Sequence, residues 1–153
     1  TASIRDMTDA SWVKTSVTTG TQFIVSQRDS TNTEGQWNFF VNDGKLIFYT
    51  EKFGQGSFVE SDSSLADGEW HHVGVSQNGD TYTFYLDGVE DGSVTSGTAI
   101  PYGRPAGAIG YNRRDAESYF NGSIDEVAVW NTGLSASDFA ELYNAGAGQQ
   151  YPF

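Results

Sequence analysis

The chain has 153 residues, of which 14% are aromatic, and its 20 acidic side chains against 8 basic ones give a net charge of −12. This length predicts one domain with a sizeable core, and the aromatic content excludes a disordered chain because so many rings need burial or ligand contact. The acidic surface repels phosphate backbones, so we expect no nucleic-acid partner. Cysteine is absent, which excludes disulfides and thiolate metal sites. No apolar run approaches the roughly 20 residues of a membrane helix, so we expect no membrane insertion.

Short segments rich in β-branched and aromatic residues follow one another along the chain, separated by tight turns. In order, they predict strands over residues 11–17, 22–27, 37–41, 45–50, 71–77, 81–86, 108–112 and 123–130. Turn pairs that favour hairpins punctuate the chain at Asp43-Gly44, Asp67-Gly68, Asn78-Gly79, Asp87-Gly88, Asp91-Gly92 and Asn121-Gly122. This pattern predicts an all-β fold in which antiparallel strands form a sandwich or barrel.

One segment near the end of the chain departs from the strand pattern. In LSASDFAELYNAGAG, Ser135 is a helix cap and Asp138 stands three residues on, as in a capping box. Phe139, Leu142 and Tyr143 share a face of the predicted helix, and Gly146 is a natural stop. We expect this short helix to lie across one end of the sandwich, with its aromatic residues as a lid on the core.

The two histidines of the chain stand side by side at positions 71 and 72. Strand alternation sends His71 to one face and His72 to the other, so the pair cannot chelate one metal ion. A zinc site needs further ligands, and no nucleophile motif accompanies either ring. We interpret both histidines as structural strand residues.

Two stretches together resemble the laminin G-like, or concanavalin A-like, jelly-roll domains. The first is DGEWHHVGV followed by FYLDGVEDG, and the second runs from AIGYN through NGSIDEVAVW to the helix that ends in ELYNAG. SWVKTS resembles the early Trp-Val strand of that family. The resemblance implies a two-sheet antiparallel β-sandwich with one short C-terminal helix, spanning residues 1–153 as a single domain.

The resemblance also implies a recognition module of a larger extracellular or surface protein, in contact with other modules of the same parent chain. The chain opens without a signal peptide, so we interpret it as a mature or excised module. Relatives carry an additional strand before the Trp-Val strand. Here TASIRDM either forms that strand in shortened form or leaves a sheet edge open.

A structural Ca²⁺ is the cofactor that the resemblance implies. In related jelly rolls the aspartate that opens the last long strand helps to hold this ion on the convex side, and Asp125 matches that position. A carboxylate with backbone carbonyls suits a hard cation, although Asp125 can equally hydrogen-bond a turn. The ligand-bridging calcium site of the pentraxins is not expected, because Arg113 and Arg114 stand where its carboxylate or amide ligands would be.

Carbohydrate, or a glycosylated surface, is the partner that the resemblance suggests. The candidate ligand-binding residues are Trp37, Tyr111, Asn112, Arg113 and Arg114. The two arginines can bind a sugar carboxylate or sulfate, or else balance the acids of their own loop. Tyr49, Phe58 and Tyr102 are further candidates for an aromatic platform, whereas alternation gives Trp37 the same face as Phe39 and Val41, the expected core face.

We expect no catalysis and assign no catalytic residue. The Glu-x-Asp-x-x-Glu pattern of related glycoside hydrolases is absent, and alternation splits the adjacent acids Glu90-Asp91 and Asp125-Glu126 across opposite faces. Three classes of function therefore stay open. The favoured one is a noncatalytic module that binds carbohydrate; the others are a spacer that mediates protein contacts without sugar, and a divergent glycosidase.

Overall fold

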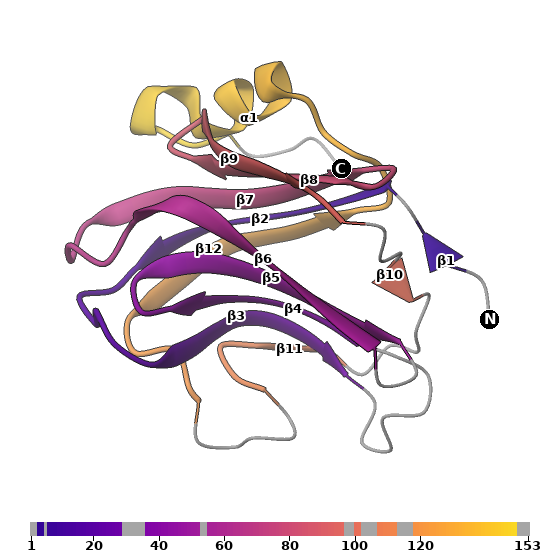
Figure 1. Cartoon of the computed structure of the whole chain (residues 1–153). Coiled ribbons are helices and arrows are strands. Elements are labelled where there is room, and N and C mark those ends of the chain that lie inside the picture. Colours follow the sequence, from indigo (N-terminus) through magenta and orange to yellow (C-terminus); the bar gives the residue numbers. More distant parts are fainter. Residues whose placement is uncertain are drawn as a thin grey trace.

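The computed structural model describes residues 3–4, 6–28, 36–52, 55–96, 100–101, 107–112 and 118–149. Over these ranges the chain forms two five-stranded antiparallel sheets packed face to face, with a short helix outside them (Figure 1). The first sheet has the strand order β11-β3-β4-β5-β6, and the second has the order β12-β2-β7-β8-β9. The predicted all-β sandwich with one short C-terminal helix is confirmed.

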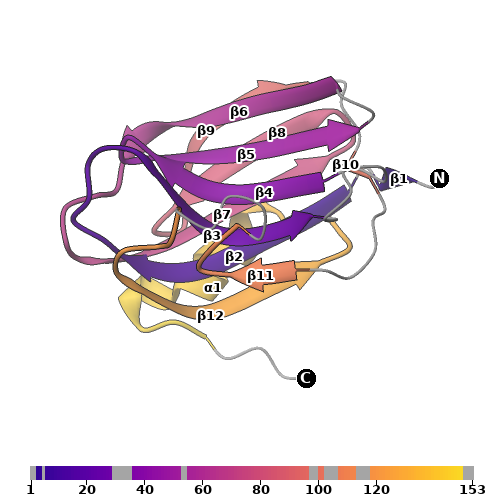
Figure 2. The same cartoon turned by 90° about the horizontal axis from the view of Figure 1, so that it is seen from below.

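The strands have the following bounds: β1 Ser3–Ile4, β2 Asp6–Lys14, β3 Thr21–Arg28, β4 Gln36–Asn42, β5 Lys45–Lys52, β6 Gln55–Ser64, β7 Trp70–Asn78, β8 Thr81–Leu86, β9 Val89–Thr95, β10 Ile100–Pro101, β11 Gly107–Ile109 and β12 Ser123–Trp130. Helix α1 spans Ala136–Tyr143, and a 3₁₀ turn, η1, follows over Asn144–Gly146. Figure 2 shows the first sheet from its outer side, with β3, β4, β5 and β6 lying side by side.

Tight turns set the register of the hairpins. Asp43 and Gly44 have φ angles of 49° and 85°, and Asp87 and Gly88 have 51° and 77°, so both pairs adopt the left-handed backbone that matches strand twist in two-residue hairpins. They join β4 to β5 and β8 to β9, as predicted. The prediction for Asp91-Gly92 is wrong, because this pair lies inside β9.

The core fills the space between the sheets. Alternating positions of β4, β5, β7 and β8 supply it, including Phe39, Phe48, Val73 and Phe84, each no more than 1% exposed. Among the described residues, fifteen buried apolar side chains form this cluster. A side chain of the first sheet that points away from the core therefore lies on the outer face of that sheet.

The first strands show whether the start of the chain leaves a sheet edge open beside the predicted Trp-Val strand. Asp6 and Met7 already belong to β2, which is hydrogen-bonded to β12 on one side and to β7 on the other. The short strand β1 pairs separately with β10. Strand β2 is thus an inner strand, and the edges of its sheet are β12 and β9.

Helix α1 begins as the sequence predicts, but it lies elsewhere. The Ser135 side chain accepts from the Asp138 backbone N–H, and the Asp138 side chain accepts from the Ser135 N–H, which completes the capping box. Phe139 is fully buried and stacks on Tyr85 of β8 with ring centroids 3.9 Å apart. The helix therefore covers the outer face of the second sheet instead of one end of the sandwich (Figure 1). It ends at Asn144, which takes the left-handed conformation (φ 47°), two residues before Gly146.

Strand β6 is an element that the strand pattern did not predict. Its sequence, QGSFVESDSS, is mostly polar because it forms an edge of the first sheet and exposes many of its side chains. Neither helix in the described part of the chain is long and apolar enough to cross a membrane.

Candidate ligand-binding groove

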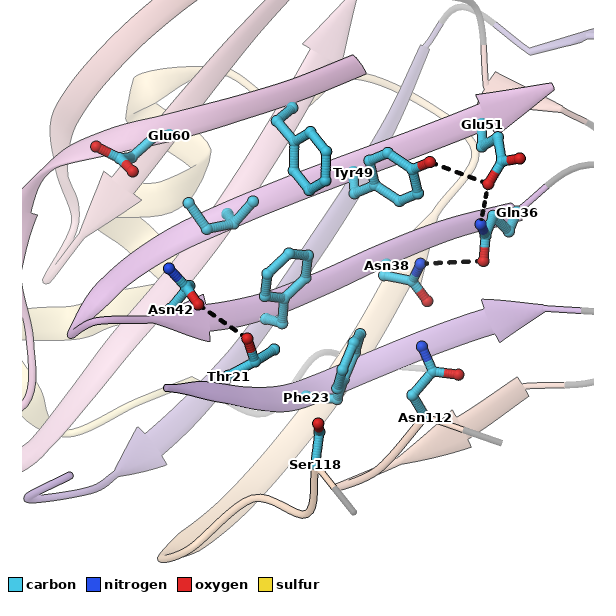
Figure 3. A pocket seen from close by; sticks show the side chains of 13 residues that line it. Thr21, Phe23, Gln36, Asn38, Asn42, Tyr49, Glu51, Glu60, Asn112 and Ser118 are labelled. Atoms are coloured by element: carbon cyan, nitrogen blue, oxygen red, sulfur yellow. Dashed lines mark hydrogen bonds between the residues drawn. The ribbon is translucent and has the colours of Figure 1, made fainter. Parts of the chain in front are cut away.

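A groove of about 650 Å³ lies on the outer face of the first sheet (Figure 3), and α1 lies on the opposite side of the sandwich (Figure 1). Strand alternation builds it, because the residues of β4 that do not enter the core, Gln36, Asn38, Phe40 and Asn42, all line it. Strands β3, β5 and β6 contribute the side chains beside them. A volume of this size is typical of small-ligand sites, which span about 300 to 1,000 Å³.

The floor of the groove is apolar. Phe23, Phe40 and Ile47, which come from three neighbouring strands, form a cluster separate from the core. The rings of Phe23 and Phe40 have centroids 5.0 Å apart. Apolar side chains on the outer face of an uncovered sheet indicate a surface that meets another molecule.

Two aromatic rings stand at the side of this floor. Tyr49 of β5 packs against the cluster, and its ring stacks on Phe58 of β6 with centroids 4.3 Å apart and planes 30° apart. Phe58 is 68% exposed. The pair offers one fixed, solvent-facing aromatic surface, here called the platform.

One end of the groove carries a directed chain of hydrogen bonds (Figure 3). A Glu51 carboxylate oxygen accepts from the Tyr49 hydroxyl at 2.9 Å and from the Gln36 side-chain amide. The Gln36 side-chain oxygen accepts in turn from the Asn38 amide nitrogen at 3.4 Å. Since a carboxylate can only accept, Glu51 sets the orientation of both amides.

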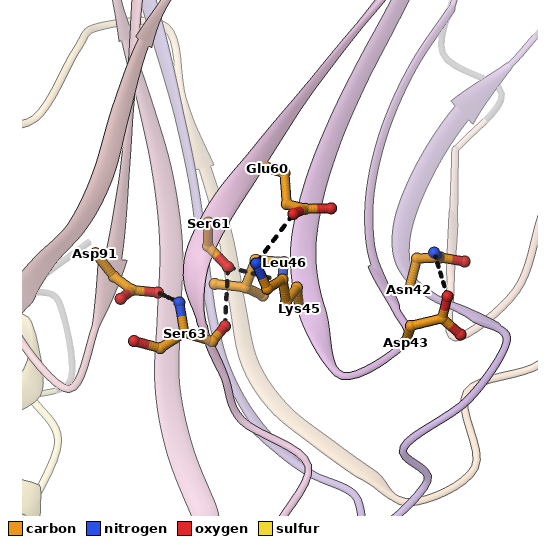
Figure 4. A network of polar contacts seen from close by, with 8 residues as sticks. All are labelled: Asn42, Asp43, Lys45, Leu46, Glu60, Ser61, Ser63 and Asp91. Atoms are coloured by element: carbon orange, nitrogen blue, oxygen red, sulfur yellow. Dashed lines mark hydrogen bonds and ion pairs between the residues drawn. The ribbon is translucent and has the colours of Figure 1, made fainter.

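The other end carries an exposed ion pair and a polar network (Figure 4). Lys45 Nζ lies 3.1 Å from Glu60 Oε1 across β5 and β6. Next to it, Ser61 Oγ accepts from the Leu46 backbone N–H at 3.0 Å. The Ser63 N–H donates to Asp91 Oδ2 of β9 at 3.1 Å, which ties the edge of the first sheet to the edge of the second. This network fixes β6, and with it the position of Phe58.

Trp37 does not belong to the groove, and its assignment as a ligand-binding residue is corrected. It is 9% exposed, faces the core, and packs on Phe48 with ring centroids 6.0 Å apart. The alternation that grouped Trp37 with Phe39 and Val41 is confirmed, and it is the reason why this indole cannot meet a ligand. Phe40, on the opposite face of the same strand, lines the groove instead.

The loop after β11 reaches the groove in part. Asn112 lines it and is 2% exposed, whereas the half-buried Tyr111 stacks on the exposed Tyr119, with ring centroids 5.9 Å apart. Arg113, Arg114 and Tyr102 lie outside the described residues, so their proposed contacts with a ligand remain predictions.

Asp125 lies on the other side of the molecule, in a shallow cleft of about 250 Å³ outside the second sheet. Its Oδ1 accepts from the N–H of Glu126, and Glu126 lines the same cleft. The predicted separation of these two acids onto opposite faces is therefore wrong. A bulge in β12 causes this, because Glu126 has a φ of 49° and alternation breaks there.

The two carboxylates of this cleft, together with backbone carbonyls, have the chemistry that Ca²⁺ accepts. Among the described residues, however, no group of three acidic or histidine side chains is placed to hold a metal ion. A cation at Asp125 stays a proposal that rests on the two carboxylates.

The histidines lie on opposite faces of β7, as predicted. His71 Nδ1 lies 2.8 Å from Asp87 Oδ2, and Nε2 lies 3.1 Å from Asp67 Oδ1. Burial acts to lower the pKa of His71, but the hydrogen bonds to Asp87 and Asp67 outweigh it and raise that pKa. His72 packs beside Trp12, with ring centroids 5.3 Å apart, and burial lowers the pKa of this ring to about 4. Neither ring lines the groove.

The two acids that line the groove stand far apart. Glu60 pairs in register with Ile47, whereas Glu51 lies four residues further along β5, which separates them by about 13 Å of strand. Figure 3 shows them at opposite ends of the groove, with the side chain of Tyr49 between. The carboxyl pairs of glycoside hydrolases lie about 5 to 9.5 Å apart.

Comparison with known proteins assigns the chain to a family. The family model described as the Concanavalin A-like lectin/glucanases superfamily (Laminin_G_3) matches residues 2–140. Comparison with curated protein sequences gives no match.

Three solved structures share the fold at low identity. The Ruminococcus gnavus IT-sialidase CBM40 superposes with a TM-score of 0.75 at 14% identity, over 90% of this chain and 82% of that one. The binding domain of Paraclostridial Mosquitocidal Protein 1 gives 0.70 at 18% identity, over 93% of this chain and 37% of that one. Domains LG4-5 of the mouse laminin α1 chain give 0.64 at 20% identity, over 90% and 38%. The chain thus spans little more than a third of two of these three chains.

Proposed function

The chain belongs to the concanavalin A-like lectin/glucanase superfamily, and from that premise we propose that it is a noncatalytic module that binds carbohydrate in the groove of its first sheet. The observation that carries the proposal is the platform of Tyr49 and Phe58 beside an apolar floor. Sugar rings present apolar C–H faces, which pack on exposed aromatic rings, together with hydroxyls that need polar partners at the edges. The groove offers both kinds of surface within one volume.

The ring geometry supports a sugar ligand in particular. Phe58 is 68% exposed to solvent although it is a large apolar side chain. The hydrogen bonds of Ser61 and Ser63 hold its strand in place. A rigid ring loses little conformational entropy when a ligand stacks on it. The polar side chains at both ends of the floor then meet hydroxyls that project from a sugar in the ring plane.

The spacing of the acids supports binding without hydrolysis. Glu51 and Glu60 lie about 13 Å apart along the strand, which is too far for the acid and the nucleophile or base of a glycosidase to act on one bond. Glu51 is moreover occupied as the acceptor for Tyr49 and Gln36. These carboxylates serve to position other groups and to accept hydrogen bonds.

We place the module in a larger extracellular or surface protein, where it brings its parent chain to a glycan. The similarity to a CBM40 module of a sialidase and to the binding domain of a mosquitocidal protein supports this setting. The expected contacts are with carbohydrate or a glycosylated surface, and with other modules of the same parent chain.

A glycan array tests the proposal when it is probed with the wild-type protein and with Phe58→Ala. Wild type should bind a defined set of glycans, and Phe58→Ala should lose about two- to thirteenfold in affinity, since stacking of a ring on an aromatic side chain is worth about 0.5–1.5 kcal/mol. Val89→Ala is the matched control, because Val89 is also an apolar side chain that is 68% exposed, but it stands on β9 of the second sheet.

The outcomes separate the three classes of function. Binding that is lost in Phe58→Ala and kept in Val89→Ala supports the groove. No binding to any glycan, in protein that unfolds cooperatively, contradicts the proposal and favours a spacer that contacts protein. Release of reducing sugar from a β-glucan, abolished by Glu51→Gln, would show a glycosidase.

A further inference from the structure

The hydrogen bonds at the Glu51 end of the groove run in one direction. The Tyr49 hydroxyl and the Gln36 amide donate to Glu51, and the Asn38 amide donates to Gln36. Each of these bonds uses one donor hydrogen inside the lining: the Tyr49 hydroxyl is turned toward Glu51, and the two amides each point one N–H group at a neighbouring acceptor.

Asn38 is the end of this chain of hydrogen bonds. Because Gln36 turns its oxygen toward Asn38, the Asn38 nitrogen faces Gln36 and its Oδ1 faces away, toward the side of the groove where Figure 3 shows Phe23 and Asn112. The residue is 2% exposed, and Oδ1 has no hydrogen-bond partner among the described residues. The oxygen is itself covered, so it acts on a ligand through the uncompensated negative partial charge that it places beneath the surface of the groove.

The formal charges have the same sign. Among the described lining residues the ionisable carboxylates are Glu51 and Glu60, and none of those residues is a lysine, arginine or histidine. Lys45 lies beside Glu60 at the rim, where it is exposed and already paired. The whole chain has a net charge of −12, so no long-range attraction for an anion offsets this local field.

We propose that the groove selects neutral glycans, which present hydroxyl or acetamido N–H donors, and discriminates against glycans that carry a carboxylate or a sulfate. The inference rests on the proposed function and names the ligand class for that site. A carboxylate offers acceptors only, so it would meet the negative charges of Glu51 and Glu60 and lose its own hydration, and the described lining holds no cation to replace that hydration. Glu51 is the positioning residue, because it acts on the ligand through Gln36 and Asn38.

This assignment differs from the ligand of a structural neighbour. The Ruminococcus gnavus CBM40 has been solved in complex with α2,3-sialyllactose, a glycan with a carboxylate. Only 13% of the residues are identical between that structure and this chain, so the shared fold leaves the polarity of the site free to differ. The described lining here has the polarity that suits the neutral counterpart.

The first test uses matched pairs of glycans that differ only in a terminal sialic acid or a sulfate. For every core glycan that binds on the array, the neutral member should bind at least about tenfold more tightly at low salt, and the difference should shrink as salt screens the charges. Equal or tighter binding of the sialylated or sulfated member overturns the inference while leaving the proposed function standing. If Arg113→Ala/Arg114→Ala then removes that preference, the loop after β11 recognises the anion. Failure to bind any glycan instead counts against the proposed function.

The second test separates the directed hydrogen bonds from simple charge. Glu51→Gln and Glu60→Gln each remove one negative charge from the same groove, but only Glu51 orients Gln36 and Asn38. A glutamine at 51 can donate as well as accept, so the Gln36 and Asn38 amides become free to turn and to offer N–H groups to the ligand. Glu51→Gln should therefore lower the ratio of neutral to sialylated affinity by at least about fivefold, with a smaller change in Glu60→Gln.

Comparison of the two variants shows whether the directed hydrogen bonds or the negative charge alone causes the discrimination. Equal changes in both variants would show that charge alone discriminates and would overturn the role of Glu51. Asn38→Leu provides a second measurement, since removal of the oxygen's partial charge should lower the ratio of neutral to sialylated affinity. An unchanged ratio in Asn38→Leu, in protein with wild-type circular dichroism, would contradict the role of the Asn38 oxygen.

Discussion

Replacing Asp9 by valine should make the protein more stable. Asp9 lies on β2, where alternation with Met7 and Val13 turns its side chain into the space between the sheets. The residue is 0% exposed, and neither carboxyl oxygen has a hydrogen-bond partner among the described residues. Burial raises the pKa of Asp9 well above its usual range, because the interior disfavours the charged form.

The size of the expected stabilisation follows from the two carboxyl oxygens that lack a hydrogen-bond partner. A buried polar group without a partner costs about 1–3 kcal/mol, and an apolar side chain of similar shape avoids that cost. The free energy of unfolding of Asp9→Val should therefore rise by about 1–3 kcal/mol at pH 7. In a chain of this size each kcal/mol shifts the melting temperature by about 2–4 °C, so the expected gain is about 2–12 °C.

The raised pKa of Asp9 also makes the stability of the wild-type protein depend on pH. Because the folded-state pKa of Asp9 is raised, the folded protein holds a proton that the unfolded chain has released, and stability falls as pH rises from the unfolded pKa of about 3.9 through the folded value. The advantage of Asp9→Val should grow over that range and then stay constant. Asp9→Asn should also remove this pH dependence.

Urea unfolding at pH 4 and pH 8 measures both effects. Ser11→Ala is the matched control, because the Ser11 hydroxyl lies on the same face of β2, fully buried and without a partner among the described residues, but does not titrate in this range. Whatever its size, the effect of Ser11→Ala on the free energy of unfolding should be the same at both pH values. A loss of stability above about 1 kcal/mol in Asp9→Val at pH 8, or a gain that is equal at both pH values, would refute the reasoning.

Other parts of the fold carry their own predicted outcomes. His71→Gln should leave glycan binding within a few-fold. It should lower the free energy of unfolding by about 0.5 kcal/mol at pH 5.5 but by less at pH 9, because the raised pKa of His71 stabilises the fold below the unfolded pKa, and that stabilisation disappears as pH rises through the folded pKa. A larger loss of stability at pH 9 than at pH 5.5 in urea titrations would contradict the pairing with Asp87. Gly74→Ala should cost about 1–3 kcal/mol, since a Cβ there would lie 2.1 Å from Phe139 Cε1; an unchanged unfolding midpoint would show that α1 does not pack there. If a Ca²⁺ ion is held at Asp125, EDTA should lower the melting temperature by about 5–10 °C and Asp125→Ala should remove that sensitivity; a melting curve of metal-free protein that ignores millimolar calcium would reject the ion.

Much of the fold could be predicted because its signals are local. The hairpin at Asp87-Gly88 follows from two adjacent residues, and the helix start follows from Ser135 and Asp138 within one turn. Alternation in β7 placed the two histidines on opposite faces, since no bulge interrupts its pairing with β2. Where a rule needs only neighbours along the chain, the sequence is sufficient.

The mistaken predictions arise where distant residues decide the outcome. The position of α1 depends on the space above Gly74, which admits Phe139 from a segment 65 residues away. The sequence pattern did not predict strand β6, because an edge strand keeps polar side chains at its exposed positions. The bulge at Glu126, which brings two acids into one cleft, uses a non-glycine residue with positive φ and leaves no sequence signal.

The groove was only partly predictable for the same reason. Tyr49 and Phe58 were recognised as candidates for an aromatic platform, but nothing in the sequence aligned them across β5 and β6. Phe40 alternates with the polar Asn38 and Asn42 along β4, and only the register with β3 brings it against Phe23.

Chemical-shift mapping with the neutral glycan that binds best on the array tests the central claim most directly. Titration of that glycan into isotope-labelled protein should shift the backbone amides of β4, β5 and β6 around Asn38, Tyr49 and Phe58, and should leave those of α1 and β9 in place. Saturable shifts confined to the first sheet are the predicted result. Shifts that cluster instead on the second sheet would contradict the assignment of the groove as the carbohydrate site.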